Sequence, residues 1–193
     1  MRRVVVINHV TLDGVMQGPG RPDEDTRGGF ERGGWAVANN DDVIGAALGE
    51  RMAESGGLLL GRRSYEDMLG YWNTQDSPLK DALNMAPKYV ASRTLREPLP
   101  WPSSTLLEGD VVHAVAELKK QPGKDLQIMG SGELIQSLLP AGLIDEYLLM
   151  IHPLVLGSGR RLFPDDGAAH SLRLVDSKTA TTGVLIATYQ PAR

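Results

Sequence analysis

The sequence contains no cysteine, and this absence excludes disulfide bonds, thiolate metal ligands and cysteine nucleophiles. A chain without cysteine fits the reducing cytoplasm, where we expect this protein to be located. Long apolar runs are also missing, because none approaches the roughly 18 residues of a membrane-spanning helix. The run Val4–Ile7 follows two arginines, but it ends too early for a signal peptide. We interpret this run as the start of the first strand.

An excess of positive charge is absent as well. Lys and Arg total 20 against 24 Asp and Glu, and the net charge of −4 argues against binding to a nucleic acid polymer. The small arginine pairs Arg62-Arg63 and Arg160-Arg161 suit one or two phosphate groups better than a polymer. The 4 histidines show no metal-ligand spacing and no H-E-x-x-H motif occurs, so we predict no metal site.

The length and composition are those of a small globular protein. A chain of 193 residues with 41% hydrophobic and 23% charged residues suits a single core, so we predict one domain over residues 1–193. Several segments have the β-branched or apolar character of strands. They cover approximately residues 3–10, 58–60, 88–92, 104–108, 126–130, 143–156, 171–177 and 182–190.

Helical patterns separate most of these strands. One helix is expected from Asp41-Asp42 to a stop at Gly56-Gly57, and others over residues 64–69, 110–120 and 131–139. Residues 17–34, rich in glycine, proline and charge, predict a long loop. The alternation predicts a three-layer α/β fold with a mixed, mostly parallel sheet of about eight strands and a C-terminal antiparallel hairpin.

Two strand-to-helix junctions carry the strongest functional signal. Gly130-Ser131-Gly132 follows one buried strand, and Gly61-Arg62-Arg63 follows another. A glycine turn lets backbone N–H groups approach a ligand, and a helix N-terminus favours an anion. The pair therefore indicates a phosphate-bearing cofactor such as a dinucleotide, although the fingerprint G-x-G-x-x-G is incomplete. Tight turns with solvated arginines are the alternative interpretation.

Two other strand ends carry polar side chains. Ser92-Arg93 suits a monophosphate such as the 2′-phosphate of NADP, or is simply a polar strand end. Asp13-Gly14 either supplies a carboxylate on the substrate side or forms an ordinary turn.

The start of the first helix is acidic. Asp41 and Asp42 are better suited to capping that helix than to acid catalysis. Trp35 lies between the long loop and this acidic start, and it either packs in the fold or contacts a substrate.

Several stretches, taken in order, resemble the dihydrofolate reductase fold, and above all the reductase-domain family of bacterial riboflavin biosynthesis. They span nearly the whole chain: Thr11–Val15, Leu59–Glu66, Lys88–Leu95, Ile128–Leu134, Gly142–Tyr147, Pro153–Gly157 and Leu162-Phe163. The resemblance implies a mixed eight-stranded sheet and NADPH as the hydride donor.

The resemblance also implies where the cofactor lies. It places Gly61, Arg62 and Arg63 at the phosphates, Ser92 and Arg93 near the 2′-phosphate, Gly130, Ser131, Gly132 and Glu133 along the pyrophosphate and nicotinamide ribose, and Asp13 and Gly14 in the loop over the nicotinamide. For the substrate side we consider Asp13 and Trp35, and for a catalytic acid Asp13 and Asp42.

These expectations lead to one hypothesis and two alternatives. The first is an NADPH-dependent reductase that passes hydride to a C=N or C=O group of a pterin-like or pyrimidine heterocycle, as a 5-amino-6-(5-phosphoribosylamino)uracil reductase does. The alternatives are dihydrofolate reductase activity and a non-catalytic nucleotide-binding protein on the same fold. The riboflavin relatives imply a homodimer, and the run Leu148–Ile151 either forms its interface or is buried in the core.

Overall fold

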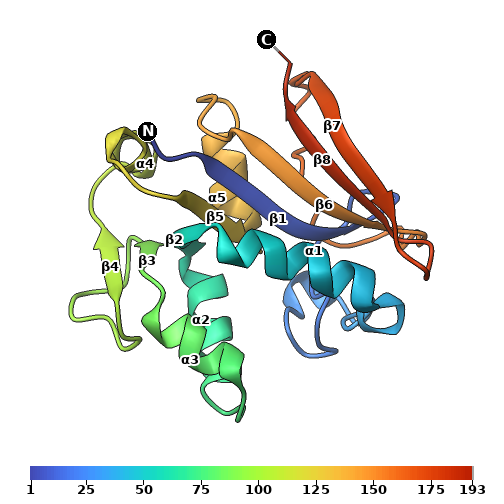
Figure 1. Cartoon of the computed structure of the whole chain (residues 1–193), viewed down its shortest axis with the longest axis horizontal. Coiled ribbons are helices and arrows are strands. Elements are labelled where there is room, and N and C mark those ends of the chain that lie inside the picture. The colour runs from blue at the N-terminus through green and yellow to red at the C-terminus, as the bar shows by residue number, and fades with distance from the viewer. Residues whose placement is uncertain (193) are drawn as a thin grey trace. The chain divides into compact units, whose positions relative to one another are not determined.

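The computed structural model describes residues 1–192. Its strands form one sheet of eight strands in the order β4-β3-β2-β5-β1-β6-β8-β7 (Figure 1). The strands are β1 (Val4–Thr11), β2 (Ser55–Gly61), β3 (Lys88–Ala91), β4 (Ser104–Leu107), β5 (Asp125–Met129), β6 (Glu146–His152), β7 (Leu172–Thr179) and β8 (Leu185–Pro191). The α/β class and the mixed sheet predicted from the sequence are confirmed.

Five α-helices and two short 3-10 turns complete the described part of the chain. They are η1 (Arg27–Gly29), η2 (Val37–Asn39), α1 (Asp42–Ala53), α2 (Arg62–Trp72), α3 (Pro78–Met85), α4 (Val111–Lys120) and α5 (Gly132–Leu138). Within residues 1–192, every helix is too short or too polar to cross a bilayer. The contacts divide the described residues into two compact units: unit 1 holds Met1–Val5 and Glu54–Leu143, and unit 2 holds Val6–Ala53 and residues 144–192.

The strands β2 to β5 of unit 1 run parallel to one another. β2 pairs with both β3 and β5, and β3 pairs with β4, in each case in the parallel sense. Their apolar side chains pack with those of α2, where Leu60, Tyr65, Val90 and Trp101 are all buried. The Tyr65 hydroxyl accepts a hydrogen bond from the backbone N–H of Trp101 at 2.9 Å. Because the strands are parallel, all four have their carboxyl ends at the same edge of the sheet.

Unit 2 contains the antiparallel part of the sheet. β8 pairs with β6 on one side and β7 on the other, both antiparallel, which confirms the predicted C-terminal hairpin. Of the run Leu148–Ile151, the first three residues are at most 5% exposed in this unit, and Ile151 is half-buried. Burial in the fold of one chain, one of the two expectations for this run, therefore accounts for its first three residues.

Several predicted boundaries need correction. Gly56-Gly57 does not stop α1, which ends at Ala53, because both glycines lie inside β2. A Cβ on Gly56 would lie 2.6 Å from the carbonyl oxygen of Lys124, so close strand packing explains that glycine. The helix predicted over 64–69 extends from Arg62 to Trp72. The strand predicted over 143–156 covers only Glu146–His152.

One helix, α3, was not predicted from the sequence. Its N-cap is Ser77, whose side chain accepts from the backbone N–H of Lys80, and Pro78 follows in the first turn. Serine before proline is a common signal for a helix start, so the information was present in the sequence.

Candidate cofactor site

The carboxyl edge of the four parallel strands in unit 1 gathers most of the residues that the sequence indicated. β2 ends at Gly61, β3 leads into Ser92-Arg93, and β5 leads into Gly130-Ser131. β4 ends at this edge too, at Leu107. In open α/β sheets this is the edge at which ligands bind.

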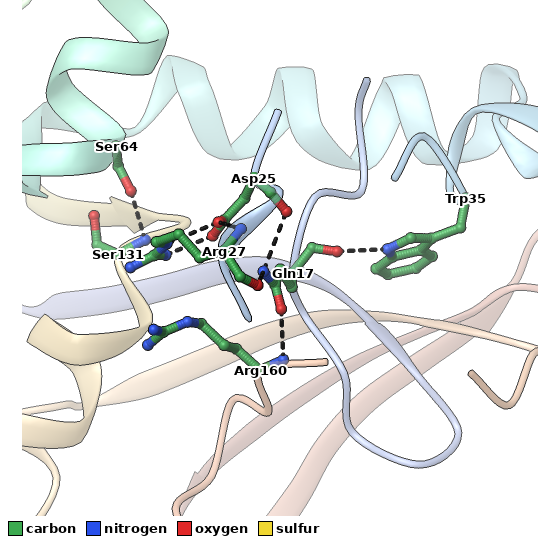
Figure 2. A network of polar contacts seen from close by, with 7 residues as sticks. All are labelled: Gln17, Asp25, Arg27, Trp35, Ser64, Ser131 and Arg160. Carbon is green, nitrogen blue, oxygen red and sulfur yellow. Dashed lines mark hydrogen bonds and ion pairs between the residues drawn. The ribbon is translucent and has the colours of Figure 1, made fainter. Parts of the chain in front are cut away.

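The two glycine junctions are joined to each other by hydrogen bonds. The backbone N–H of Ser131 donates to Ser64 Oγ at 2.8 Å, as Figure 2 shows. The backbone N–H of Gly61 donates to Ser131 Oγ at 3.0 Å. Ser131 thus binds the start of α2 through both its backbone and its side chain, and it fixes the spacing between the two junctions.

The turn after β5 needs an unusual backbone. Gly130 has φ of 64° and Ser131 has φ of 54°, so both are in the left-handed region. A Cβ on Gly130 would lie 3.0 Å from Ser64 Oγ, which leaves little room for any side chain. Ser131 tolerates the conformation because its hydroxyl accepts the hydrogen bond from Gly61. Glu133 follows in the first turn of α5.

The N-terminus of α2 is positively charged. Arg62 and Arg63 are its first two residues, its first turn holds no acidic residue, and its N-cap Gly61 contributes no side-chain hydrogen bond. Arg62 Nη1 donates to Thr94 Oγ1 at 3.1 Å, which links α2 to the segment after β3. Arg63 is exposed. Two guanidinium groups at a helix N-terminus attract an anion.

A hollow of about 390 Å³ lies beyond the ends of β3 and β4. Its lining includes Ser92, Arg93, Arg96, Glu97 and Glu108. Ser92 Oγ accepts hydrogen bonds from the backbone N–H groups of Thr94 at 3.1 Å and Leu95 at 3.0 Å. The serine oxygen is therefore held in place while its own hydrogen can still be donated. The hollow offers two arginines and a hydroxyl to an anionic group, and of its two carboxylates that of Glu97 already accepts from two backbone N–H groups.

The substrate-side residues predicted from the sequence lie in unit 2. Asp13 accepts hydrogen bonds from Thr11 Oγ1 at 2.6 Å, from Leu156 N at 3.2 Å and from Gly157 N at 2.8 Å. These bonds, led by the one from Thr11, lower the pKa of Asp13 to about 2. Gly14 follows with φ of 80° in a tight turn. The carboxylate of Asp13 thus connects the turn after β1 to the segment after β6.

Asp41 and Asp42 lie at the start of α1, as expected. Asp41 accepts from the backbone N–H of Ile44 at 2.9 Å and from both the N–H and the hydroxyl of Thr181 at 2.7 Å each. The bond from Ile44 is the main reason why the pKa of Asp41 is lowered. Asp41 is therefore a helix cap that also holds the β7–β8 turn. Asp42 is exposed in the first turn.

The long loop of unit 2 is organised by a residue that the sequence did not single out. The Gln17 side chain donates to the carbonyl oxygens of Asp25 and Arg27 at 3.1 and 2.9 Å, and accepts from the N–H of Arg160 at 2.9 Å (Figure 2). Trp35 Nε1 donates to the Gln17 carbonyl oxygen at 2.7 Å. No sequence pattern marks a lone glutamine in a loop for this role.

The family model for the RibD C-terminal domain matches residues 2–186. The chain belongs to this family. A relative, the uncharacterized protein YyaP of Bacillus subtilis, is 30% identical over 97% of this chain and 94% of its own length. The resemblance stated from the sequence motifs is thereby confirmed.

Solved structures confirm the fold. A putative riboflavin biosynthesis protein from Shewanella sp. PV-4 superposes with a TM-score of 0.69 at 23% identity and covers 99% of both chains. Dihydrofolate reductase from Enterococcus faecalis, in a complex that includes NADP(H), superposes with a TM-score of 0.59 at 15% identity, over 99% of this chain and 97% of that one. This member of the RibD C-terminal domain family therefore has the dihydrofolate reductase-like fold.

Proposed function

We propose that the protein is an NADPH-dependent reductase that acts on a pyrimidine or pterin-like heterocycle. The observation that carries the proposal is the coupling of the two junctions through Ser64 and Ser131 at the carboxyl edge of unit 1. Beside that coupling lie the arginines of α2 and the arginine-lined hollow. Membership of the RibD C-terminal domain family supports an oxidoreductase as the reaction class.

The residues of the carboxyl edge fit the cofactor phosphates. Arg62 and Arg63 at the start of α2 are suited to the pyrophosphate, because guanidinium groups and helix N–H groups both bind phosphate oxygens. The left-handed conformation of Gly130 turns the backbone between β5 and α5 at this same edge of the sheet. Ser92 and Arg93 in the hollow are suited to the 2′-phosphate that distinguishes NADPH from NADH.

Bound NADPH would supply the hydride, and the protein would bind and orient the reactants. In this proposal Gly61, Gly132 and Glu133 line the cofactor beside the residues named above, and Gly14 belongs to a covering loop. Asp13 and Trp35 stay proposed for the substrate side, and Asp13 and Asp42 for the catalytic acid. Of these, Asp13 is the least suited to donate a proton, because its pKa is about 2.

The test is a titration of the protein with NADPH and, in parallel, with NADH, in which nicotinamide fluorescence reports binding. Arg93→Ala should weaken NADPH binding about 10- to 100-fold, since a charge-assisted hydrogen bond is removed, and should leave NADH binding nearly unchanged. Arg173→Ala is the matched control, because Arg173 lies on β7 in unit 2 and bonds to Gln190. Equal losses for both cofactors would remove the 2′-phosphate assignment, and no binding of either cofactor to the native protein would end the reductase proposal.

We also propose a homodimer in solution. Since Leu148–Met150 are buried within unit 2, an interface has to use other residues. Sedimentation equilibrium measures the mass in solution, which should be about twice the 20.9 kDa of one chain. A species of 20.9 kDa alone would contradict the homodimer.

A further inference from the structure

Unit 2 contains a hydrogen-bonded pair of histidines that the proposed cofactor site does not use. His9 on β1 and His152 at the end of β6 lie with Nδ1 of His9 2.8 Å from Nε2 of His152. His152 is fully buried, and among the described residues its Nδ1 has no hydrogen-bond partner. The rings of Trp35 and His152 pack nearly perpendicular to each other, with 5.2 Å between ring centroids.

The position of the hydrogen between the two rings follows from the unpaired Nδ1 of His152. A neutral imidazole carries one N–H and one bare nitrogen. If His9 donated from Nδ1, His152 would have to carry its hydrogen on the buried Nδ1, where no described group accepts it. Proteins avoid such a buried donor. If His152 donates from Nε2, its Nδ1 is only an unused acceptor, so the bond runs from His152 to His9.

This direction fixes the form of the second ring. With its Nδ1 accepting from His152, a neutral His9 must carry its own hydrogen on Nε2. His9 is half-buried, and its described hydrogen bond is the one to His152. Unit 2 therefore holds a neutral N–H donor that remains available to another molecule.

The same geometry opposes protonation of the pair. A proton added to His9 Nδ1 would break the bond, and a proton added to His152 would leave a buried N–H without an acceptor. Burial lowers the pKa of His9 to about 4, with a smaller contribution from His152, and burial also lowers the pKa of His152. The described ring contacts of the pair, with each other and with Trp35, include no charged side chain. Both rings are neutral at pH 7.

We propose that His152 is a positioning residue that holds His9 as a neutral Nε2–H donor, and that this N–H binds a carbonyl oxygen or ring nitrogen of the heterocyclic substrate. The identity of the substrate class rests on the proposed function above. A neutral imidazole donates without the desolvation cost of a charged group, and it can polarise a carbonyl while keeping its proton.

The first experiment observes the histidine rings directly in the native protein. Long-range nitrogen–proton correlation NMR at pH 7 should show His9 with hydrogen on Nε2 and His152 with hydrogen on Nε2, and His9 should stay neutral down to about pH 5. His152→Phe should give His9 a mixed tautomer, because the donor that fixes the ring is lost, whereas His152→Gln should restore the native tautomer because its amide donates. A hydrogen on Nδ1 of His9 in the native protein would overturn the proposal.

The second experiment tests the ligand in the NADPH complex, with 5,6-diaminouracil and folate as probes. His9→Met removes the donor and should weaken binding about tenfold or more, whereas His9→Gln retains an N–H near the same place and should stay within about threefold. Both variants should bind NADPH as the native protein does. Equal weakening by both variants, or binding of NADPH but of neither probe, would overturn the ligand assignment. Failure of NADPH itself to bind would instead contradict the proposed function. The NMR experiment would still test the hydrogen positions on His9 and His152 independently.

Discussion

Asp13 shows how one carboxylate can hold a site together without taking part in proton transfer. Its two oxygens accept from Thr11, Leu156 and Gly157, of which the last lies 144 positions from Asp13 in the chain. Those donors favour the ionised form, so the pKa falls to about 2. At neutral pH the group is a fixed anion that connects two segments of unit 2.

This arrangement predicts the behaviour of Asp13→Asn. The amide replaces one acceptor oxygen with a donor that faces an N–H, so at pH 7 the unfolding temperature should fall by a few degrees, on the order of 2–4 °C. A carboxyl whose pKa is depressed in the folded state contributes stability above the unfolded pKa of about 3.9. That contribution is lost as the pH falls through about 2. Thermal unfolding followed by circular dichroism from pH 7 to pH 2 should show the two proteins converge.

Asp76→Asn is a suitable control, because Asp76 is exposed. It should unfold like the native protein at every pH. The same pair of variants separates structure from catalysis for Asp13. A large loss of turnover in Asp13→Asn with no change in unfolding temperature would contradict the connecting role and favour the catalytic role proposed from the sequence.

At the scale of single residues, the sequence predicts the local role of a side chain better than it predicts which distant residue that side chain contacts. Asp41 as a helix cap is confirmed, because capping depends on neighbours along the chain. The bond between Ser131 and Ser64 spans 67 positions, and the pair of His9 and His152 spans 143. No local spacing encodes such contacts, because the sheet order brings the residues together only in the folded chain.

Among the elements, α3 depends on a buried cation. Lys88 at the start of β3 is fully buried, and its Nζ donates to the carbonyl oxygens of Leu83 and Ala86 near the end of α3, the latter at 2.7 Å. The same Nζ lies 4.8 Å from the centroid of the Trp101 ring. A cation there satisfies carbonyl groups at the negative end of the helix dipole.

Lys88→Met keeps a side chain of similar length and removes every donor. Buried carbonyl groups would then lack partners, so the free energy of unfolding should fall by on the order of 3 kcal/mol. Urea unfolding measures this change. Lys80→Met is the control, because Lys80 lies on α3 itself and is only half-buried. It should change the free energy of unfolding by about 0.5 kcal/mol or less. If both variants lost the same stability, the capping role of Lys88 would be wrong.

Most elements could be predicted because their signals are local. The β-branched run of β1, the apolar run of β5 and the Asp110 cap of α4 all lie where the sequence indicated. Gly56-Gly57 misled the prediction, because glycine marks both helix ends and places where strands pack closely. The sequence predicted a loop around Gln17 but not its order, because the hydrogen bonds of Gln17 join segments that are far apart in the chain.

For the whole molecule, the pair of His9 and His152 should set the response to mild acid. A histidine in an unfolded chain has a pKa near 6.5, whereas the pKa of folded His9 is about 4. Between these values the unfolded chain binds more protons than the folded one. The free energy of unfolding should therefore fall as the pH falls from about 6.5 to 4, with a slope on the order of 1 kcal/mol per pH unit.

Urea unfolding at pH 7, 6 and 5 measures that slope, and His152→Phe isolates its source. The variant removes one buried histidine and releases the restraint on the other, so its stability should depend less on pH than that of the native protein. His170→Gln is the control, because His170 is exposed, and it should retain the native slope. A native protein equally stable at pH 7 and pH 5 would mean that both rings accept protons without cost, and this would contradict the hydrogen-bond direction assigned to the pair.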